Sequence, residues 1–214
     1  MQIYPSMSPL QLGGKQGSAV ALGYFDGIHI GHRAVIGGAV DWAQAHGAAA
    51  ALFTFKLPGG SKIKGRRLFS VEDKRRIVAG LGIEHYLVPA FADIMAMTPE
   101  QFVLGLVADC RARAFFCGEN FTFGAKAAGD PALLKKLCAP LGVEVHVLPM
   151  AAFEGRPVSS TRIRAALEGG DIPAVNAMLG TPYAIRFPVQ HGAGLGRTLG
   201  VPTINQIYPE GYQL

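Results

Sequence analysis

The sequence is poor in charge, and several features that would define other classes of protein are absent from it. Only 16% of the 214 residues are charged and half are hydrophobic, with three cysteines and one tryptophan. This composition is typical of a folded globular protein and excludes disorder over most of the chain. No apolar run reaches the roughly 18–20 residues that a membrane-spanning helix needs. The length allows one large domain, or one domain with part of another.

The cysteines Cys110, Cys117 and Cys138 are odd in number and have no C-x-x-C spacing. They predict reduced thiols in a cytoplasmic protein, and they favour neither a disulfide framework nor a zinc site. The first residues lack a basic segment followed by an apolar stretch, so no signal peptide is predicted.

The formal net charge of +5 comes largely from a basic run between Lys56 and Arg76. Such a run has three interpretations: a nucleic-acid footprint, a surface that attracts a polyanionic small substrate, or a solvated surface. Aromatic residues are not interleaved with the basic ones, and no nucleic-acid-binding motif is present. We therefore expect neither a nucleic acid nor a membrane as a partner, and the sequence predicts no oligomeric state.

Strand and helix signals alternate along the chain. Short apolar runs predict strands over Ser18–Phe25, Ala48–Phe55, His85–Ala90, Arg113–Cys117 and Val143–Pro149. Capping residues and helical spacing predict helices over Arg33–His46 and Ser70–Leu81, after Thr98 and Asp130, and over Arg162–Glu168 and Ile172–Leu179. The order predicts an α/β fold, a Rossmann-like parallel five-stranded sheet with helices on both faces.

Ligands of such sheets bind beyond the carboxyl ends of the strands. Three loops are expected to meet there: Gly23–Gly31, Gly118–Gly129 and Arg156–Thr161. After Pro182 the pattern changes, because a predicted strand over Tyr183–His191 and a glycine-rich segment follow without a helix signal. We expect residues 1–182 to form the first domain and residues 183–214 to be the start of a second, β-rich (barrel) domain too short to bury a core of its own.

The first candidate site is the turn G-Y-F-D-G-I-H-I-G-H, from Gly23 to His32. A glycine-punctuated turn between a strand and a helix presents backbone N–H groups where a phosphate is readily held. Imidazole N–H groups of His29 and His32 would add donors, which suits attack on the α-phosphate of a nucleoside triphosphate. Zinc is the competing ligand, but no third ligand with a suitable local spacing completes such a site. The G-x-G-x-x-G fingerprint and the Walker A loop are both absent.

The second candidate site is V-S-S-T-R-I-R, from Val158 to Arg164. Hydroxyls and free N–H groups at a helix start favour an anion, and Arg164 lies one turn further on, within reach of a phosphate. Plain N-capping by Ser160 would explain one serine, although not the triplet together with two arginines.

The strings H-I-G-H and S-S-T-R-I-R resemble the paired motifs of the nucleotidyltransferase superfamily. The longer strings G-Y-F-D-G-I-H-I-G-H-R, C-G-E-N-F-T-F-G-A-K-A-A-G-D and V-S-S-T-R-I-R-A-A-L-E-G-G-D resemble the bacterial bifunctional riboflavin kinase/FAD synthetase. The string G-R-T-L-G-V-P-T-I-N resembles the opening of its kinase domain. The resemblance implies an FMN adenylyltransferase that transfers AMP from ATP to FMN, giving FAD and pyrophosphate, with Mg²⁺.

The resemblance also implies roles for single residues. The implied catalytic residues are His29, His32 and Arg164. The implied ATP contacts are Gly23, Phe25, Asp26, Gly31, Asn120, Ser159, Ser160 and Thr161. On the FMN side it implies Tyr24 and Phe123. Thr203 and Asn205 match kinase positions that hold Mg²⁺ and nucleotide phosphate, and we expect no riboflavin phosphorylation from so short a kinase segment.

The sequence departs from the family at three places. Tyr24 stands where the family has Asn, Asn120 stands where it has Asp, and Thr54–Gly59 replaces a T-F-x-P-H-P segment on the flavin side. Our hypothesis is that the basic residues Lys62, Lys64 and Arg66 bind the FMN phosphate instead. Two alternatives stay open: transfer to another phosphorylated acceptor, and a non-catalytic protein that binds flavin or nucleotide.

Overall fold

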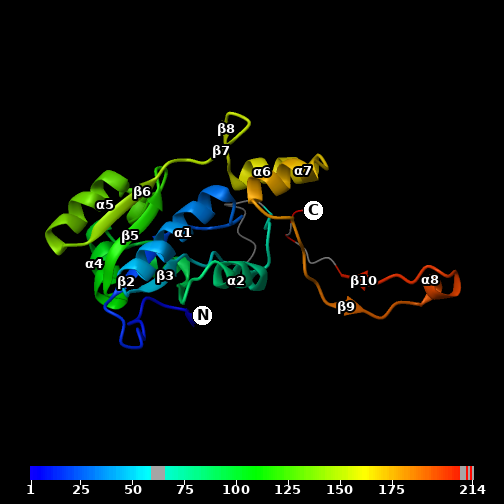
Figure 1. The fold of residues 1–214 in the computed structure, drawn as a ribbon, viewed down its shortest axis with the longest axis horizontal. Coiled ribbons are helices and arrows are strands. Elements are labelled where there is room, and N and C mark those ends of the chain that lie inside the picture. The colour runs from blue at the N-terminus through cyan, green and yellow to red at the C-terminus, as the bar shows by residue number, and fades with distance from the viewer. Residues whose placement is uncertain (59–65, 208–210, 212, 214) are drawn as a thin grey trace.

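The computed structural model describes residues 1–58, 66–207, 211 and 213. Its centre is a six-stranded parallel sheet with the order β1-β4-β3-β2-β5-β6 (Figure 1). The strands of the sheet are β1 (Gln2–Tyr4), β2 (Ser18–Leu22), β3 (Ala49–Phe53), β4 (His85–Leu87), β5 (Ala112–Gly118) and β6 (Glu144–Leu148). The α/β class with a parallel sheet is confirmed, and the predicted number of five strands is wrong.

The additional strand, β1, pairs in parallel with β4 at one edge of the sheet. Its three residues are mostly exposed, so they carry neither the length nor the continuous apolar run that marks the buried strands. By contrast, all five residues of β2 and of β3 are buried, as expected for strands covered on both faces.

Helices cover both faces of the sheet, and others lie away from it (Figure 1). They are α1 (Ile30–Ala45), α2 (Val71–Gly80), α3 (Phe91–Ile94), α4 (Pro99–Cys110), α5 (Pro131–Cys138), α6 (Ser160–Glu168), α7 (Ile172–Leu179) and α8 (Leu195–Thr198). Side chains alternate across each strand. Val20 and Leu22 accordingly face a core shared with α4 and α5, while Ala19 and Ala21 face a core shared with α1 and α2.

Sequence signals for helix starts are confirmed at several positions. Ser70 caps α2, Asp130 caps α5, and Thr98 forms a capping box with Gln101 at the start of α4. In each case a side-chain oxygen accepts a backbone N–H that has no partner inside the helix.

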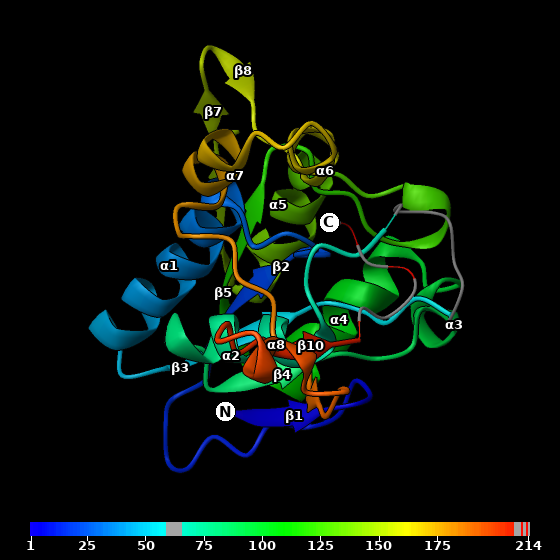
Figure 2. The same cartoon turned by 90° about the vertical axis from the view of Figure 1, so that its right-hand side faces the viewer.

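A third, smaller core joins α6 and α7 to Leu68 and Phe69. Ile77 of α2 packs against this third core and also against the core between the sheet and α1, so α2 connects these two cores. Arg33 of α1 donates from Nε to the carbonyl of Leu179 at 2.9 Å, which holds the α6–α7 pair beside the start of α1 (Figure 2).

Beyond Pro182, most of the predicted strand Tyr183–His191 does not form. Only β9 (Val189–Gln190) pairs, with β10 (Asn205–Gln206), in a hairpin that extends away from the body as an arm (Figure 1). The residues before β9 instead contact α2 and the segment that precedes it. Tyr183 donates its hydroxyl to the carbonyl of Leu68 at 3.1 Å, and Arg186 forms an ion pair with Asp73 at 3.1 Å.

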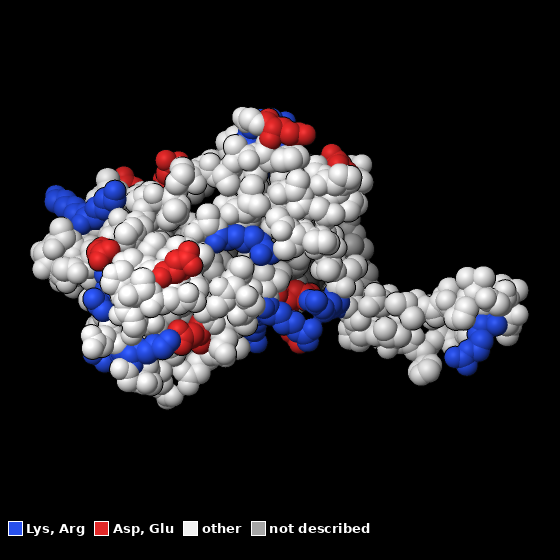
Figure 3. Space-filling model, in the orientation of Figure 1, with Lys and Arg blue, Asp and Glu red and all other residues white. Residues whose placement is uncertain are grey.

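Two short 3-10 helices (Ala125–Ala127 and Ala139–Leu141) and a small hairpin of β7 (Ala152–Phe153) and β8 (Arg156–Pro157) complete the described fold. None of the described helices is both long and apolar enough to cross a membrane. On the face shown in Figure 3, positive side chains are spread among negative ones, with one group near the base of the arm.

Candidate active site

The turn from Gly23 to His29 leaves the carboxyl end of β2, the strand between β3 and β5. The direction of connection along the sheet changes at this strand, and doubly wound sheets bind their ligands at such a point. Phe25 and Ile28 have positive φ angles of 50° and 41°, although neither is glycine. Both side chains are buried, so core packing maintains a backbone conformation that is costly in isolation.

His29 is the N-cap of α1. Its Nδ1 accepts the backbone N–H of His32 at 3.3 Å, so the neutral ring carries its proton on Nε2 and can donate there. The two imidazole rings stack with their centroids 3.7 Å apart, and Phe25 meets His32 edge-on at 5.3 Å. Nδ1 of His32 is buried and has no hydrogen-bond partner among the described residues.

Burial keeps both imidazoles neutral. Desolvation lowers the pKa of His29 to about 4. Desolvation, followed by the charges of His29 and Lys74, lowers the pKa of His32 well below its usual value. The two rings therefore offer neutral N–H donors near pH 7, not imidazolium charges.

The second motif starts α6. Ser159 is the N-cap and accepts the N–H of Arg162 at 3.2 Å, so the cap is not Ser160. Arg162 faces the β7–β8 hairpin, where it donates to the carbonyls of Phe153 and Arg156 at 2.7 and 3.0 Å. Arg164 faces the turn after β2.

Two contacts join the motifs. Arg164 forms an ion pair with Asp26, and both side chains are nearly buried, at 13% and 11% exposure. The backbone of Gly27 also lies close to Ser160. A Cβ atom added at Gly27 would be only 3.2 Å from Oγ of Ser160, closer than most Cβ contacts. Two of the three predicted loops, Gly23–Gly31 and Arg156–Thr161, therefore meet at the carboxyl edge of the sheet. The third, Gly118–Gly129, follows β5 at the same edge.

The segment before α2 also reaches this edge. The carbonyl of Arg66 accepts a hydrogen bond from Nε of Arg164 at 2.6 Å, while the Arg66 side chain is exposed. Lys62 and Lys64, predicted to bind the FMN phosphate, lie outside the described residues.

Next to the turn, three aromatic rings follow the ends of neighbouring strands. Tyr24 and Phe55 have centroids 5.1 Å apart, and Phe55 and Phe91 are also 5.1 Å apart. Phe55 and Phe91 are partly exposed, and Thr54 fixes the turn by donating its hydroxyl to the carbonyl of Tyr24 at 2.8 Å. Phe91 was not predicted as a site residue; its position shortly after the end of β4 is the signal that could have identified it.

The remaining predicted site residues come from the loop after β5 and from the arm. Phe123 is buried in the core on the α4 side and packs against Phe102 and Phe121, whereas Asn120 is exposed in the preceding loop. Thr203 and Asn205 lie on the arm. Glu119, from the same loop as Asn120, accepts the N–H of Met150 at 3.2 Å.

The described residues contain no group of three or more His, Cys, Asp or Glu side chains that could hold a metal ion. The three cysteines are buried and free, and burial raises the pKa of the Cys110 thiol to about 12. Neither zinc ligation nor thiolate chemistry is therefore supported by the part of the chain that is described.

Comparison with known proteins identifies the family. The family model described as FAD synthetase matches residues 13–162, and the one described as riboflavin kinase matches residues 179–213. The bifunctional riboflavin kinase/FMN adenylyltransferase of Bacillus subtilis is 34% identical over 88% of this chain and 61% of its own length. The protein of the same name from Escherichia coli K12 is 30% identical over 96% of this chain and 67% of its own length.

This chain thus spans about three fifths of the length of the Bacillus relative. A crystal structure of a macrolide-efflux protein from Streptococcus pneumoniae aligns with a TM-score of 0.83 and 25% identity, over all of this chain and 70% of its own. Together with the paired motifs at the carboxyl edge of the sheet, the match over residues 13–162 shows that the chain belongs to the FAD synthetase family.

Proposed function

We propose that the chain is an FMN adenylyltransferase that transfers AMP from ATP to FMN and releases pyrophosphate. The observation that carries this proposal is the meeting of the two motifs, through the Asp26–Arg164 ion pair and the close approach of Gly27 to Ser160. One motif supplies donors for the phosphorus under attack and the other supplies a site for the leaving group. Family membership supports ATP and FMN as the substrates.

The transfer needs no proton from the protein. A phosphate oxygen of FMN attacks the α-phosphorus, and the bond to the oxygen that bridges to the β-phosphate breaks. The electron pair leaves with pyrophosphate, and charge spreads over the α-phosphate oxygens in the transition state. Neutral His29 and His32 stabilise that charge by donating hydrogen bonds, as oxyanion donors do.

The α6 start suits the leaving pyrophosphate. In the proposal Ser159, Ser160 and Thr161 present hydroxyls and N–H groups to the β- and γ-phosphates, and Arg164 exchanges Asp26 for a phosphate oxygen. The remaining ATP contacts are those that the family implies: Gly23, Phe25, Asp26, Gly31 and Asn120.

On the acceptor side, the ring of Tyr24 packs against that of Phe55, which packs against Phe91. In the proposal these rings offer an apolar surface to the flavin ring. Phe123 is buried in the core, so in the proposal it supports the loop after β5 on the flavin side and does not present its ring at the surface. The hypothesis that Lys62, Lys64 and Arg66 bind the FMN phosphate is tested by neutralising all three, which should raise the KM for FMN.

Mg²⁺ is part of the proposal only as the partner of ATP. Since the described residues hold no metal-binding cluster, the phosphates themselves would supply most of its ligands. The division into residues 1–182 and 183–214, with Thr203 and Asn205 in a kinase segment, stays a prediction.

The test is an incubation of the pure chain with Mg-ATP and FMN, followed by separation of flavins and measurement of pyrophosphate. We expect FAD and pyrophosphate in equal amounts. Product with another phosphorylated acceptor but not with FMN would change the assigned substrate, and no product with any acceptor would favour a non-catalytic binding protein.

A further inference from the structure

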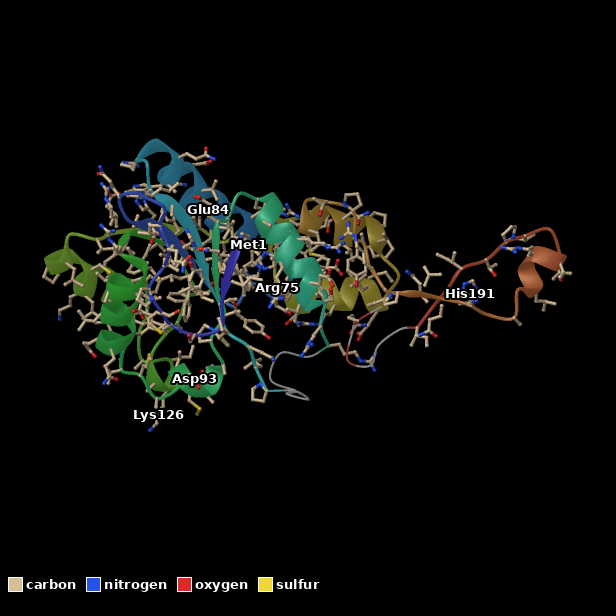
Figure 4. All side chains as sticks on the ribbon, turned by 90° about the horizontal axis from the view of Figure 1, so that it is seen from below. Met1, Arg75, Glu84, Asp93, Lys126 and His191 are labelled. Atoms are coloured by element: carbon tan, nitrogen blue, oxygen red, sulfur yellow. The ribbon has the colours of Figure 1, made fainter. Side chains whose placement is uncertain are left out.

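Lys74 lies in the first half of α2, close to the turn after β2. Its Nζ atom is 5.2 Å from the centroid of the Tyr24 ring, which places the ammonium over an aromatic face. Lys74 itself is only partly exposed. Figure 4 shows α2 between the sheet and the α6–α7 pair, with the next residue, Arg75, labelled.

The ammonium has no ion pair and no hydrogen bond within residues 1–58 and 66–207, although the charge of the Asp26 carboxylate acts on it. Asp26 is paired with Arg164, and Asp73 receives Arg186 and the hydroxyl of Ser70. Burial lowers the pKa of Lys74, and the charge of Asp26 opposes that effect. The cation–π contact with Tyr24 compensates only part of the lost hydration.

His32 provides a second observation on the same side of the turn. Its Nδ1 is buried without a partner, and its pKa is lowered in part by the charge of Lys74. The ammonium of Lys74 is thus close enough to the His32 ring for its charge to act on it. Buried polar atoms are normally satisfied, so the unpartnered Nδ1 of His32 indicates that a ligand completes it.

We propose that Lys74 is a catalytic residue that contacts the phosphate of FMN and the α-phosphate of ATP together. This rests on the proposed function, because that reaction must bring two anionic phosphates into contact. The ammonium of Lys74 lies over Tyr24, on the acceptor side, and its charge acts on His32, on the donor side. In the proposal this charge offsets the repulsion between the two phosphates.

The bonds made and broken are those of the adenylyl transfer already described. A phosphate oxygen of FMN bonds to the α-phosphorus, the electron pair leaves with pyrophosphate, and Lys74 stays protonated throughout. In the structure the ammonium lies over the Tyr24 ring, and in the proposal it contacts both phosphates during the transfer. Tyr24, where the family has asparagine, orients the ammonium through the cation–π contact.

The test compares Lys74→Met and Lys74→Arg with a control, Lys136→Met, on the exposed part of α5. We expect Lys74→Met to lower kcat/KM for FMN by about 10²–10³-fold, as loss of an oxyanion donor does. Lys74→Arg keeps the charge and should retain part of the activity, and Lys136→Met should retain all of it.

A binding measurement separates contact with phosphate from a structural role. Flavin fluorescence quenching is followed with α,β-methylene ATP present, using FMN and then riboflavin, which lacks the phosphate. We expect Lys74→Met to weaken FMN binding at least tenfold and to leave riboflavin binding unchanged. Equal weakening of both flavins, or kcat/KM within about threefold of the wild type, would overturn the proposal.

If Lys74→Met does not fold, Lys74→Arg and Lys74→Gln are measured in the same way, with circular dichroism to show that each is folded. A wild-type chain that makes no FAD would contradict the proposed function, whereas the comparison of FMN with riboflavin would still decide whether Lys74 binds a phosphate. FAD formation that is insensitive to Lys74 would contradict only this inference.

Discussion

Replacing Asp26 with asparagine removes the carboxylate that holds Arg164 in the site without ligands. Both side chains are nearly buried, at 11% and 13% exposure, so the guanidinium would remain desolvated without its counter-charge. Removing one partner of a buried pair costs about 3–5 kcal/mol. The carbonyl of Arg66, which accepts from Nε, still compensates in part, so we expect the lower end of that range.

For a chain of this size, a loss of about 3 kcal/mol lowers Tm by roughly 6–12 °C. Differential scanning fluorimetry of Asp26→Asn against the wild type measures this change. The matched control is Glu72→Gln, because Glu72 pairs with Arg76 on the surface at 2.8 Å. An exposed i,i+4 pair contributes only about 0.3–0.5 kcal/mol, so the control should melt within about 2 °C of the wild type.

Pyrophosphate then tests the reason for the loss. If Arg164 binds the leaving group, pyrophosphate replaces the missing carboxylate in Asp26→Asn, whereas in the wild type it must compete with Asp26. A ligand at a hundred times its Kd stabilises by about 2.7 kcal/mol. The rise in Tm on adding pyrophosphate should therefore be larger in the variant. An unchanged Tm, or the same rise in both proteins, would refute the reasoning.

Three further predictions concern the turn. His29→Ala should lower kcat by about 10²–10³-fold with a smaller change in the KM for ATP, because its donor is aimed at charge that builds in the transition state; steady-state kinetics measure this. The folded pKa of His29 is about 4, below its usual 6.5, so its contribution to stability is complete above pH 6.5 and is lost as the pH falls towards 4, by up to about 3 kcal/mol. Urea unfolding measures this as the free energy of unfolding at pH 6.5 and at pH 4. The decrease between the two should be smaller in His29→Gln than in the wild type. Gly27→Ala would place a Cβ 2.9 Å from Leu68 and 3.2 Å from Ser160, so we expect about 1–3 kcal/mol of destabilisation and reduced activity, whereas Gly37→Ala, with no atom within 4 Å, should be neutral or stabilising.

The buried part of the fold was predictable because its signals are local. Apolar runs mark β2 and β3, and the caps Ser70, Thr98 and Asp130 each satisfy N–H groups of the helix that they start. The strand β1 was missed because three mostly exposed residues have no detectable pattern. The predicted strand from Tyr183 fails because Tyr183 and Arg186 contact α2 and its preceding segment, a tertiary preference that sequence spacing does not contain.

The site was predictable in its motifs but not in its internal contacts. Spacing placed His29 and His32 at a strand–helix turn, yet only the fold shows that His29 caps α1 and that burial keeps both rings neutral. Similarly, the sequence predicted that Arg164 reaches a phosphate, but it did not show what Arg162 and Arg164 contact within the protein. The structure separates them, because Arg162 is engaged by the carbonyls of a hairpin while Arg164 reaches Asp26.

The central claim is that the turn after β2 and the start of α6 together transfer an adenylyl group. The most direct measurement follows radiolabel from ATP into product, with FMN as acceptor and the label at the α-phosphate in one reaction and at the γ-phosphate in the other. We expect the α-label in FAD and the γ-label in pyrophosphate. Label from the γ-position in a flavin, or no α-label in any flavin product, would contradict it.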